Sequence, residues 1–581
     1  MFTESNIRLF VVVFQVVTNM TDAWNRKKAG CVAFLLGTSF LVLCYHGGTY
    51  LVNVHISHHK TRKVVVDVTE QSVLLSPTLA HVTPTYEDFL RRCKKMDIRA
   101  FRKTKSSVIY SRITGITKDN SDMNTVYIHI QTFDQQNRSK TVGGDLLHVI
   151  VTSDHVDGRV GGHVTDHGDG RYTGVVRLLW TDKVHIHVQI GSVLENVCLR
   201  LQATEKFGNQ VFTKEKGWGI RGFYRGNIWA PCGANAFICG YNTTCNFTEI
   251  NDNMSWYCGK PRDTNLQCSD IRAFKTGPFD VSAATQFEKI ILPTVETLQD
   301  SVTLTHNVDT AYKHLSNTSL EKCSRRSSVY SWREGMDHPS GYWFNRTWIF
   351  YNCSSSIRHD PAIYRQCLKG KTLYFFGDST VKQYAEFFLE KIMNLQKKNN
   401  NDFKGDNGDY HYRRALSGQG INLVYFKHAM PFHNPNFPPK GITSIPTELA
   451  RLSESEIPGT DLIIFVSYHT HFQAYPISEF KDRILKLVSA VKHLLSVKPK
   501  TKVFFKGPHF IHDDIRWFDN RMSLFYRDII HEAFSELASD VTYDVIYLDT
   551  WWVTVTHGNT DLHPRGDAFI GQIQQLMTYL C

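Results

Sequence analysis

The sequence of 581 residues predicts a protein of several domains whose C-terminal part is a three-layer α/β unit, with helices on both faces of a parallel sheet. Three patterns lead to this prediction. Apolar strand-like runs alternate with helix-like runs from residue 371 to 581, and short runs of alternating polarity fill residues 86–205. Between them, residues 206–275 contain five cysteines and little periodicity. We therefore expect an N-terminal β-sandwich, a disulfide-rich module and the α/β unit, in that order.

The N-terminal segment contains a candidate membrane anchor. Residues 1–28 end in Arg26-Lys27-Lys28, and an apolar stretch follows over 29–52. This length approaches the roughly 20 residues that span a bilayer, and the preceding basic cluster predicts a cytoplasmic tail, a signal-anchor transmembrane helix and a lumenal remainder. A cleaved signal peptide is the alternative. Residues 53–85 are polar and rich in turn formers, which indicates a stem.

Residues 86–205 show the period of two that is typical of strands. The ranges 126–131 and 184–188 alternate in polarity, and Asp169-Gly170 supplies a turn between two further runs. Such spacing predicts an antiparallel sandwich. His185 and His187 alternate with apolar residues, so we interpret them as the solvent-facing side of a strand; a metal site is the alternative.

The cysteines and glycosylation signals indicate the secretory pathway. No CxxC pair occurs, so disulfides are a better interpretation than zinc. Beyond residue 52 the number of cysteines is odd, which leaves one thiol free or paired with another chain. We expect disulfides among Cys93, Cys198, Cys232, Cys239, Cys245, Cys258, Cys268, Cys323, Cys353, Cys367 and Cys581. Asn-x-Ser/Thr glycosylation sequences occur at Asn137, Asn242, Asn246, Asn253, Asn317, Asn345 and Asn352.

The net charge of +11 is spread along the chain. No basic stripe interleaved with aromatic residues occurs, so the composition argues against a nucleic-acid partner. An anionic glycan or a membrane surface suits a mild positive excess equally well.

After a mixed connecting segment, 276–370, the pattern changes to an alternation of strands and helices. Expected strands lie at 372–376, 422–426, 461–467, 501–506 and 545–549. Expected helices lie at 380–395, 479–495 and 522–537. This order implies a parallel sheet, in which ligands bind beyond the carboxyl ends of the strands.

The first of these strands leads into the candidate nucleophile. Gly377-Asp378-Ser379 follows an apolar run and opens a helix, a position in which Ser379 gains the helix dipole and backbone N–H donors. A serine hydroxyl also needs a base, and His563 near the C-terminus is the best candidate, with Asp561 to orient it. A simple helix cap after a strand is the alternative interpretation of Gly377 and Asp378.

Other residues are candidates for the oxyanion site or the cleft. Gly418 and Gly420 precede a strand and could each supply a backbone N–H. Ser467 ends the expected strand 461–467, and His469 and His471 follow it and point to the site if that strand is central. We interpret His509 and His512 as ordinary loop residues.

The chain resembles the NXPE family, whose members join a neurexophilin-like region to a PC-esterase domain. The segments that carry this resemblance are 229–232 with the cysteines that follow up to Cys268, 339–343, 375–379, 471–472 and 563–581. PC-esterase domains are SGNH-like, and the resemblance implies addition or removal of acetyl groups on glycans, including sialic acids. It implies no bound cofactor; acetyl-CoA or another acyl donor would be a co-substrate. Residues 140–190 also resemble a filamin-type immunoglobulin repeat, which fits the sandwich.

The sequence departs from the SGNH pattern at the acid. That group usually places Asp three residues before His, where this chain has Thr560, and Asp561 is only two residues before. A Ser379–His563 dyad is one resolution and loss of activity is another. We therefore keep two functions: a membrane-anchored Golgi or ER glycan O-acetyltransferase or O-acetylesterase, and a non-catalytic secreted or cell-surface ligand with a degenerate esterase domain and an extracellular protein partner.

Overall fold

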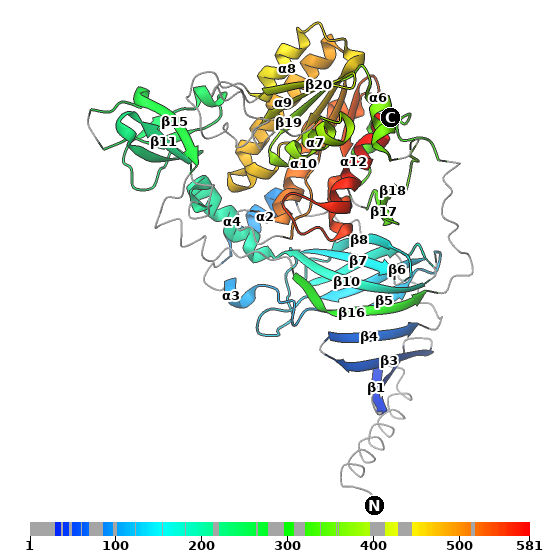
Figure 1. Ribbon diagram of the computed structural model, residues 1–581. Helices are drawn as coiled ribbons and strands as arrows, with labels where there is room; N and C mark the ends of the chain where they lie inside the picture. Colours follow the sequence, from blue (N-terminus) through cyan, green and yellow to red (C-terminus); the bar gives the residue numbers. More distant parts are fainter. Residues whose placement is uncertain are drawn as a thin grey trace, which may run out of the picture.

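The computed structural model describes residues 85–96, 101–212, 220–276, 296–306, 320–395, 413–427, 444–512 and 518–581, apart from isolated positions, and the backbone of four strands between residues 30 and 68. Its main bodies are a sandwich of antiparallel strands and a layered α/β unit, with the cysteine module at the side (Figure 1).

The α/β unit is built on one sheet with strand order β20-β21-β19-β22-β23-β24. The five strands from β21 to β24 in this order are parallel, and β20 is an antiparallel edge strand. All five strands expected from the sequence are present. The bounds are β19 Thr372–Gly377, β20 Arg413–Gly418, β21 Ile421–Lys427, β22 Leu462–Val466, β23 Lys502–Lys506 and β24 Asp544–Leu548.

Helices cover both faces of this sheet, and the side chains of β19 show why. Tyr374 and Phe376 pack into the cluster of α8, α9 and α10, while Leu373 and Phe375 pack into the opposite cluster of α6, α7, α11 and α12. A strand buried on both faces is apolar throughout, as β19 is. The bounds are α6 Pro361–Leu368, α7 Ser379–Phe387, α8 Ile445–Ser453, α9 Ile477–Val497, α10 Asn520–Ser539, α11 Thr550–His557 and α12 Gly566–Leu580. The helix expected at 380–395 is α7 followed by a π-helical turn, Phe388–Ile392.

The antiparallel strands form the expected sandwich around a separate apolar core. β8 pairs with β7 through its first half and with β9 through its second half, and so joins the two layers. β16 comes from the predicted connecting segment yet pairs with β10, and the hairpin β17–β18 extends from β8. The bounds are β5 Arg112–Lys118, β6 Thr125–Gln131, β7 Leu146–Ser153, β8 Gly158–Asp166, β9 Arg171–Arg177, β10 Asp182–Ser192, β16 Glu296–His306, β17 Gly341–Phe344 and β18 Thr347–Phe350.

The predicted transmembrane helix over 29–52 is wrong for this structure, which has strands there. These are β1 Gly30–Leu36, β2 Ser39–Tyr45 and β3 Thr49–His59, followed by β4 Thr61–Val68, which lies parallel to β16. The range contains several valines, whose branched side chains favour extended backbone. In the part of the chain that the structure describes, no helix is both long and apolar enough to cross a membrane. The predicted tail, residues 1–28, lies outside the described residues.

The cysteine-rich module is a small sheet held by two disulfides. Cys232–Cys258 joins β12 to β14, and Cys245–Cys268 ties β13 to the turn before β15. Cys239 is a free thiol, so its expected place in a disulfide is wrong and the odd cysteine is identified. The bounds are β11 Ile220–Tyr224, β12 Trp229–Gly233, β13 Thr244–Asn246, β14 Tyr257–Gly259 and β15 Ile271–Thr276.

Three further disulfides tie distant segments together: Cys93–Cys198, Cys323–Cys353 and Cys367–Cys581. The first joins helix α2, Tyr86–Lys94, to helix α4, Leu194–Phe207. Six of the seven predicted glycosylation asparagines are exposed, and Asn317 lies outside the described residues. Disulfides and exposed acceptor sites fit an oxidising compartment.

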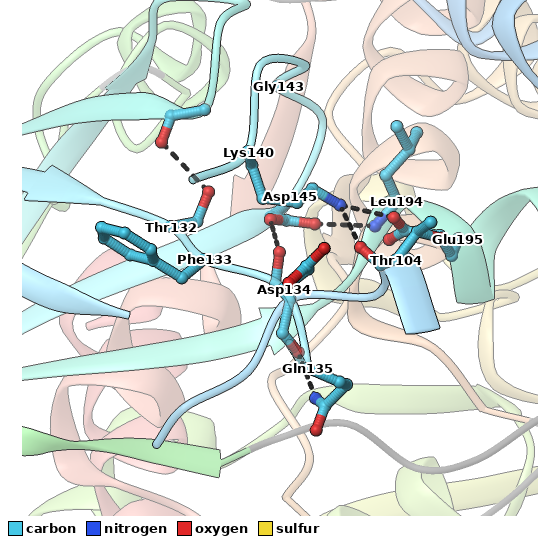
Figure 2. A network of polar contacts seen from close by, with 12 residues as sticks. Thr104, Thr132, Phe133, Asp134, Gln135, Lys140, Gly143, Asp145, Leu194 and Glu195 are labelled. Atoms are coloured by element: carbon cyan, nitrogen blue, oxygen red, sulfur yellow. Dashed lines mark hydrogen bonds and ion pairs between the residues drawn. The ribbon is translucent and has the colours of Figure 1, made fainter. Parts of the chain in front are cut away.

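A buried polar network fastens the sandwich to α4 (Figure 2). Lys140 forms an ion pair with Glu195 and donates to the carbonyl of Thr104 in the short helix α3, Phe101–Thr104. Asp145 accepts hydrogen bonds from Ser106 and from the backbone N–H of Leu194, the latter at 2.9 Å. Because these charges are buried, each needs its partner, so the network fixes how the sandwich meets the helices.

Candidate active site

Ser379 lies where β19 meets α7, at the carboxyl edge of the sheet. Asp378 is the N-cap of α7, and its carboxylate accepts from the backbone N–H of Thr380 at 2.8 Å and from the Thr380 hydroxyl at 2.7 Å. Gly377 is needed for the tight turn, because a Cβ there would lie 2.4 Å from Val381 Cγ2 and 2.9 Å from the Ser467 carbonyl oxygen. The turn therefore presents Ser379 at the first position of the helix.

His563 reaches Ser379 from the turn between α11 and α12. Its Nε2 atom lies 2.7 Å from the Ser379 Oγ atom, although the two residues are far apart in sequence. This distance is within the range of a general base and the hydroxyl that it activates. The structure thus brings together the nucleophile and base nominated from the sequence.

Asp561 lies on the same turn, and its carboxylate is engaged elsewhere. Its Oδ2 atom is 3.5 Å from Nε of Arg565, and this pair is partly exposed. Its backbone carbonyl accepts from the side chain of Asn559 at 2.8 Å. The described contacts of Asp561 therefore position the turn and pair a surface arginine.

Ser467, His469 and His471 line the neighbouring strand end, because β22 lies beside β19. Ser467 extends the pairing by donating its N–H to the Phe376 carbonyl at 3.0 Å. Burial lowers the pKa of His471 to about 4, while the Asp378 carboxylate acts in the opposite direction and His563 in the same direction as burial. Burial also holds the pKa of His469 well below its ordinary value. We therefore expect both imidazoles to be neutral at physiological pH. The charges of Asp378 and His563 both act on His471.

Residues 348–581 match the family model described as NXPE family member 4-like, C-terminal domain. The matched range runs from β18 to the last residue and includes every side chain of the site above. The match covers less than half of the chain and supports NXPE family membership through this C-terminal domain.

The structure places Gly418 and Gly420 away from this site, so their nomination as oxyanion donors is wrong. Gly418 ends β20 and pairs with Ile421, at the start of β21, and the next residue, Asn422, pairs with Thr372, at the start of β19. The hairpin therefore lies at the amino edge of the parallel strands, opposite Ser379.

Two residues that the sequence did not single out as site residues lie behind the base. Lys506 ends β23, is buried, and approaches His509 with 3.2 Å between Nζ and Nδ1. Burial lowers the pKa of Lys506 to about 8 against the opposite effect of Asp378. His509 is buried as well, and its Nε2 atom lies 2.9 Å from the Leu562 carbonyl oxygen. Their position directly after a parallel strand was the available signal.

Among the described residues, no group of three or more His, Cys, Asp or Glu side chains could hold a metal ion. The chemistry that these residues can perform is proton transfer between a hydroxyl and an imidazole.

Proposed function

We propose that this NXPE protein is a serine-dependent O-acetylesterase or O-acetyltransferase that acts on glycans in the lumen of the Golgi or ER, on an SGNH-like α/β fold. The observation that supports this most directly is the 2.7 Å approach of His563 Nε2 to Ser379 Oγ at the carboxyl edge of a parallel sheet. Five disulfides and exposed glycosylation sequences support the lumenal location.

The proposed reaction proceeds through an acyl-enzyme. Ser379 Oγ attacks the ester carbonyl carbon while His563 Nε2 takes its proton. The oxyanion that forms faces the start of α7, where the N–H of Ser379 and the helix dipole favour negative charge. His563 then returns the proton to the leaving alcohol, which departs and leaves acyl-Ser379.

The second half of the reaction decides between hydrolysis and transfer. Water gives acetate and free enzyme, whereas a sugar hydroxyl gives a new ester. In each case His563 takes the proton from the attacking hydroxyl and gives it to Ser379 Oγ as the bond between that oxygen and the acyl carbon breaks. For transfer we propose acetyl-CoA or another activated acyl donor as co-substrate and a glycan or glycoprotein, including a sialylated one, as acceptor.

The test uses the full chain from a secretory host, with a fluorophosphonate probe and an aryl acetate. Ser379 should be labelled, and Ser379→Ala or His563→Ala should each abolish labelling and hydrolysis. The double variant should be no worse than either single one, since either loss disables the pair. Ser417→Ala, on the edge strand β20, is the matched control. Full hydrolysis by Ser379→Ala would remove this proposal and favour the non-catalytic ligand.

A further inference from the structure

The turn that carries His563 is held by side-chain bonds to its main-chain carbonyls. Asn559 donates to the Asp561 carbonyl at 2.8 Å, His509 approaches the Leu562 carbonyl at 2.9 Å, and Gln383 donates to the Pro564 carbonyl at 3.2 Å. The three donors come from the turn itself, the loop after β23 and helix α7. The carbonyls on both sides of His563 are therefore fixed from different parts of the fold.

The contacts of His509 determine which of its nitrogens carries the proton. The Leu562 carbonyl only accepts, so Nε2 of His509 must be protonated and donate. Its other nitrogen, Nδ1, faces the side-chain nitrogen of Lys506, whose ammonium form only donates, so Nδ1 accepts. Burial holds the pKa of His509 well below its ordinary value, in agreement with a neutral ring. Lys506 thus fixes the tautomer in which His509 holds the turn.

Gln383 adds a direct connection between the two halves of the site. It lies one helical turn after Ser379 on α7, so its bond to Pro564 joins the nucleophile's helix to the turn of the base. Any displacement of the turn relative to α7 has to break this bond.

We propose that His509 and Gln383 are positioning residues that orient His563 toward Ser379 through the main chain of its turn, with Lys506 setting the tautomer of His509. This inference rests on the proposed function, because it concerns the alignment of that base. Alignment matters because a displacement of about 1 Å in a reacting pair can cost on the order of 100-fold in rate.

The test compares His509→Gln with His509→Leu. A glutamine amide can place its NH₂ donor near the position of Nε2, whereas leucine has no donor. We expect His509→Leu to lower kcat on an aryl acetate by roughly 10- to 100-fold with little change in KM. His509→Gln should recover most of this loss. Hydrogen exchange of the amides between Asp561 and Arg565 should rise in His509→Leu and stay near the wild-type rate in His509→Gln.

The outcomes separate this inference from the proposed function. Wild-type protein whose Ser379 resists the fluorophosphonate probe would overturn both. Suppose that Ser379 of the wild type is labelled. If His509→Leu then hydrolyses the aryl acetate as fast as wild type, or His509→Gln is as impaired as His509→Leu, the positioning role alone would be overturned. If His509→Leu does not fold, Gln383→Met gives a second test on α7: it lacks the donor to the Pro564 carbonyl and should also lower kcat, and an unchanged rate would contradict the inference.

Discussion

The side chain of Gln383 donates a hydrogen bond to the Pro564 carbonyl, so helix α7 and the turn before α12 are bonded directly across the site. A second bond supports this one: the hydroxyl of Tyr384 donates to Gln572 of α12 at 2.6 Å. The C-terminal residue, Cys581, is also tied to α6 by its disulfide with Cys367. The C-terminal helix is therefore a structural part of the nucleophile's surroundings, and the distance from His563 to Ser379 depends on how α12 is anchored.

Asp561→Asn tests whether the carboxylate beside the base contributes to the rate. Its contact with Arg565 is partly exposed, and exposed ion pairs contribute about 0–1 kcal/mol. We expect kcat on an aryl acetate to fall by less than about fivefold. Arg565→Gln should lower kcat by a similarly small factor. A loss as severe as that of His563→Ala would show instead that the carboxylate orients the imidazole.

Gly377→Ala should damage both stability and activity. The added Cβ would lie 2.4 Å from Val381 Cγ2 and 2.9 Å from the Ser467 carbonyl oxygen, so β19 and α7 must separate. Overpacking of this kind costs about 1–3 kcal/mol, which urea denaturation would measure. Gly115→Ala is the control, because its nearest neighbour would be 3.8 Å away. Equal effects of the two changes would contradict this account of the turn.

The parts predictable from sequence are those whose pattern is local. The five parallel strands are continuous apolar runs. Ser379 comes directly after one of them, and His563 lies near the C-terminus. β16 was missed because its partner, β10, is more than a hundred residues earlier, and such pairing leaves no local signal. Gly418 and Gly420 were misplaced because the sequence did not show that their strand is an antiparallel edge. His509 was passed over because a histidine in a loop reveals neither its burial nor its acceptor.

Thiol labelling without reductant should modify Cys239 and no other cysteine between residues 85 and 581. The remaining ten in this range form five disulfides, whereas Cys239 is half-buried and free. Burial raises the pKa of its thiol, so we expect slow labelling that speeds up as pH rises. Mass spectrometry of the labelled peptides would measure this, and modification of Cys232 or Cys258 would contradict the pairing.

Asp549→Asn should make stability less dependent on pH. Asp549 is buried between β24 and α11, and burial raises the pKa of its carboxyl from 3.8 to about 6. Between these two values the folded state binds more protons than the unfolded state, so this group lowers stability as pH rises from about 4 to 6. Asparagine does not ionise and can retain the cap of α11. The variant should gain unfolding free energy relative to wild type at pH 7 and lose this gain at pH 4.

The last prediction concerns how the sandwich is joined to the α/β unit. Asp519 caps α10 and also accepts from the hydroxyl of Ser192, at the end of β10, at 2.8 and 2.9 Å. Asp519→Ala removes the cap and leaves the buried Ser192 hydroxyl without its acceptor. We therefore expect the free energy of unfolding to fall by roughly 2–4 kcal/mol.

Asp360→Ala is the matched control, because Asp360 caps α6 through the N–H of Ala362 at 2.7 Å and should cost only about 1 kcal/mol. Since the bond crosses between the two bodies, Asp519→Ala should lower the stability of both together, in a single transition seen by tryptophan fluorescence and by circular dichroism. Two separate transitions, or equal losses for the two variants, would mean that the sandwich and the α/β unit are held together by other contacts.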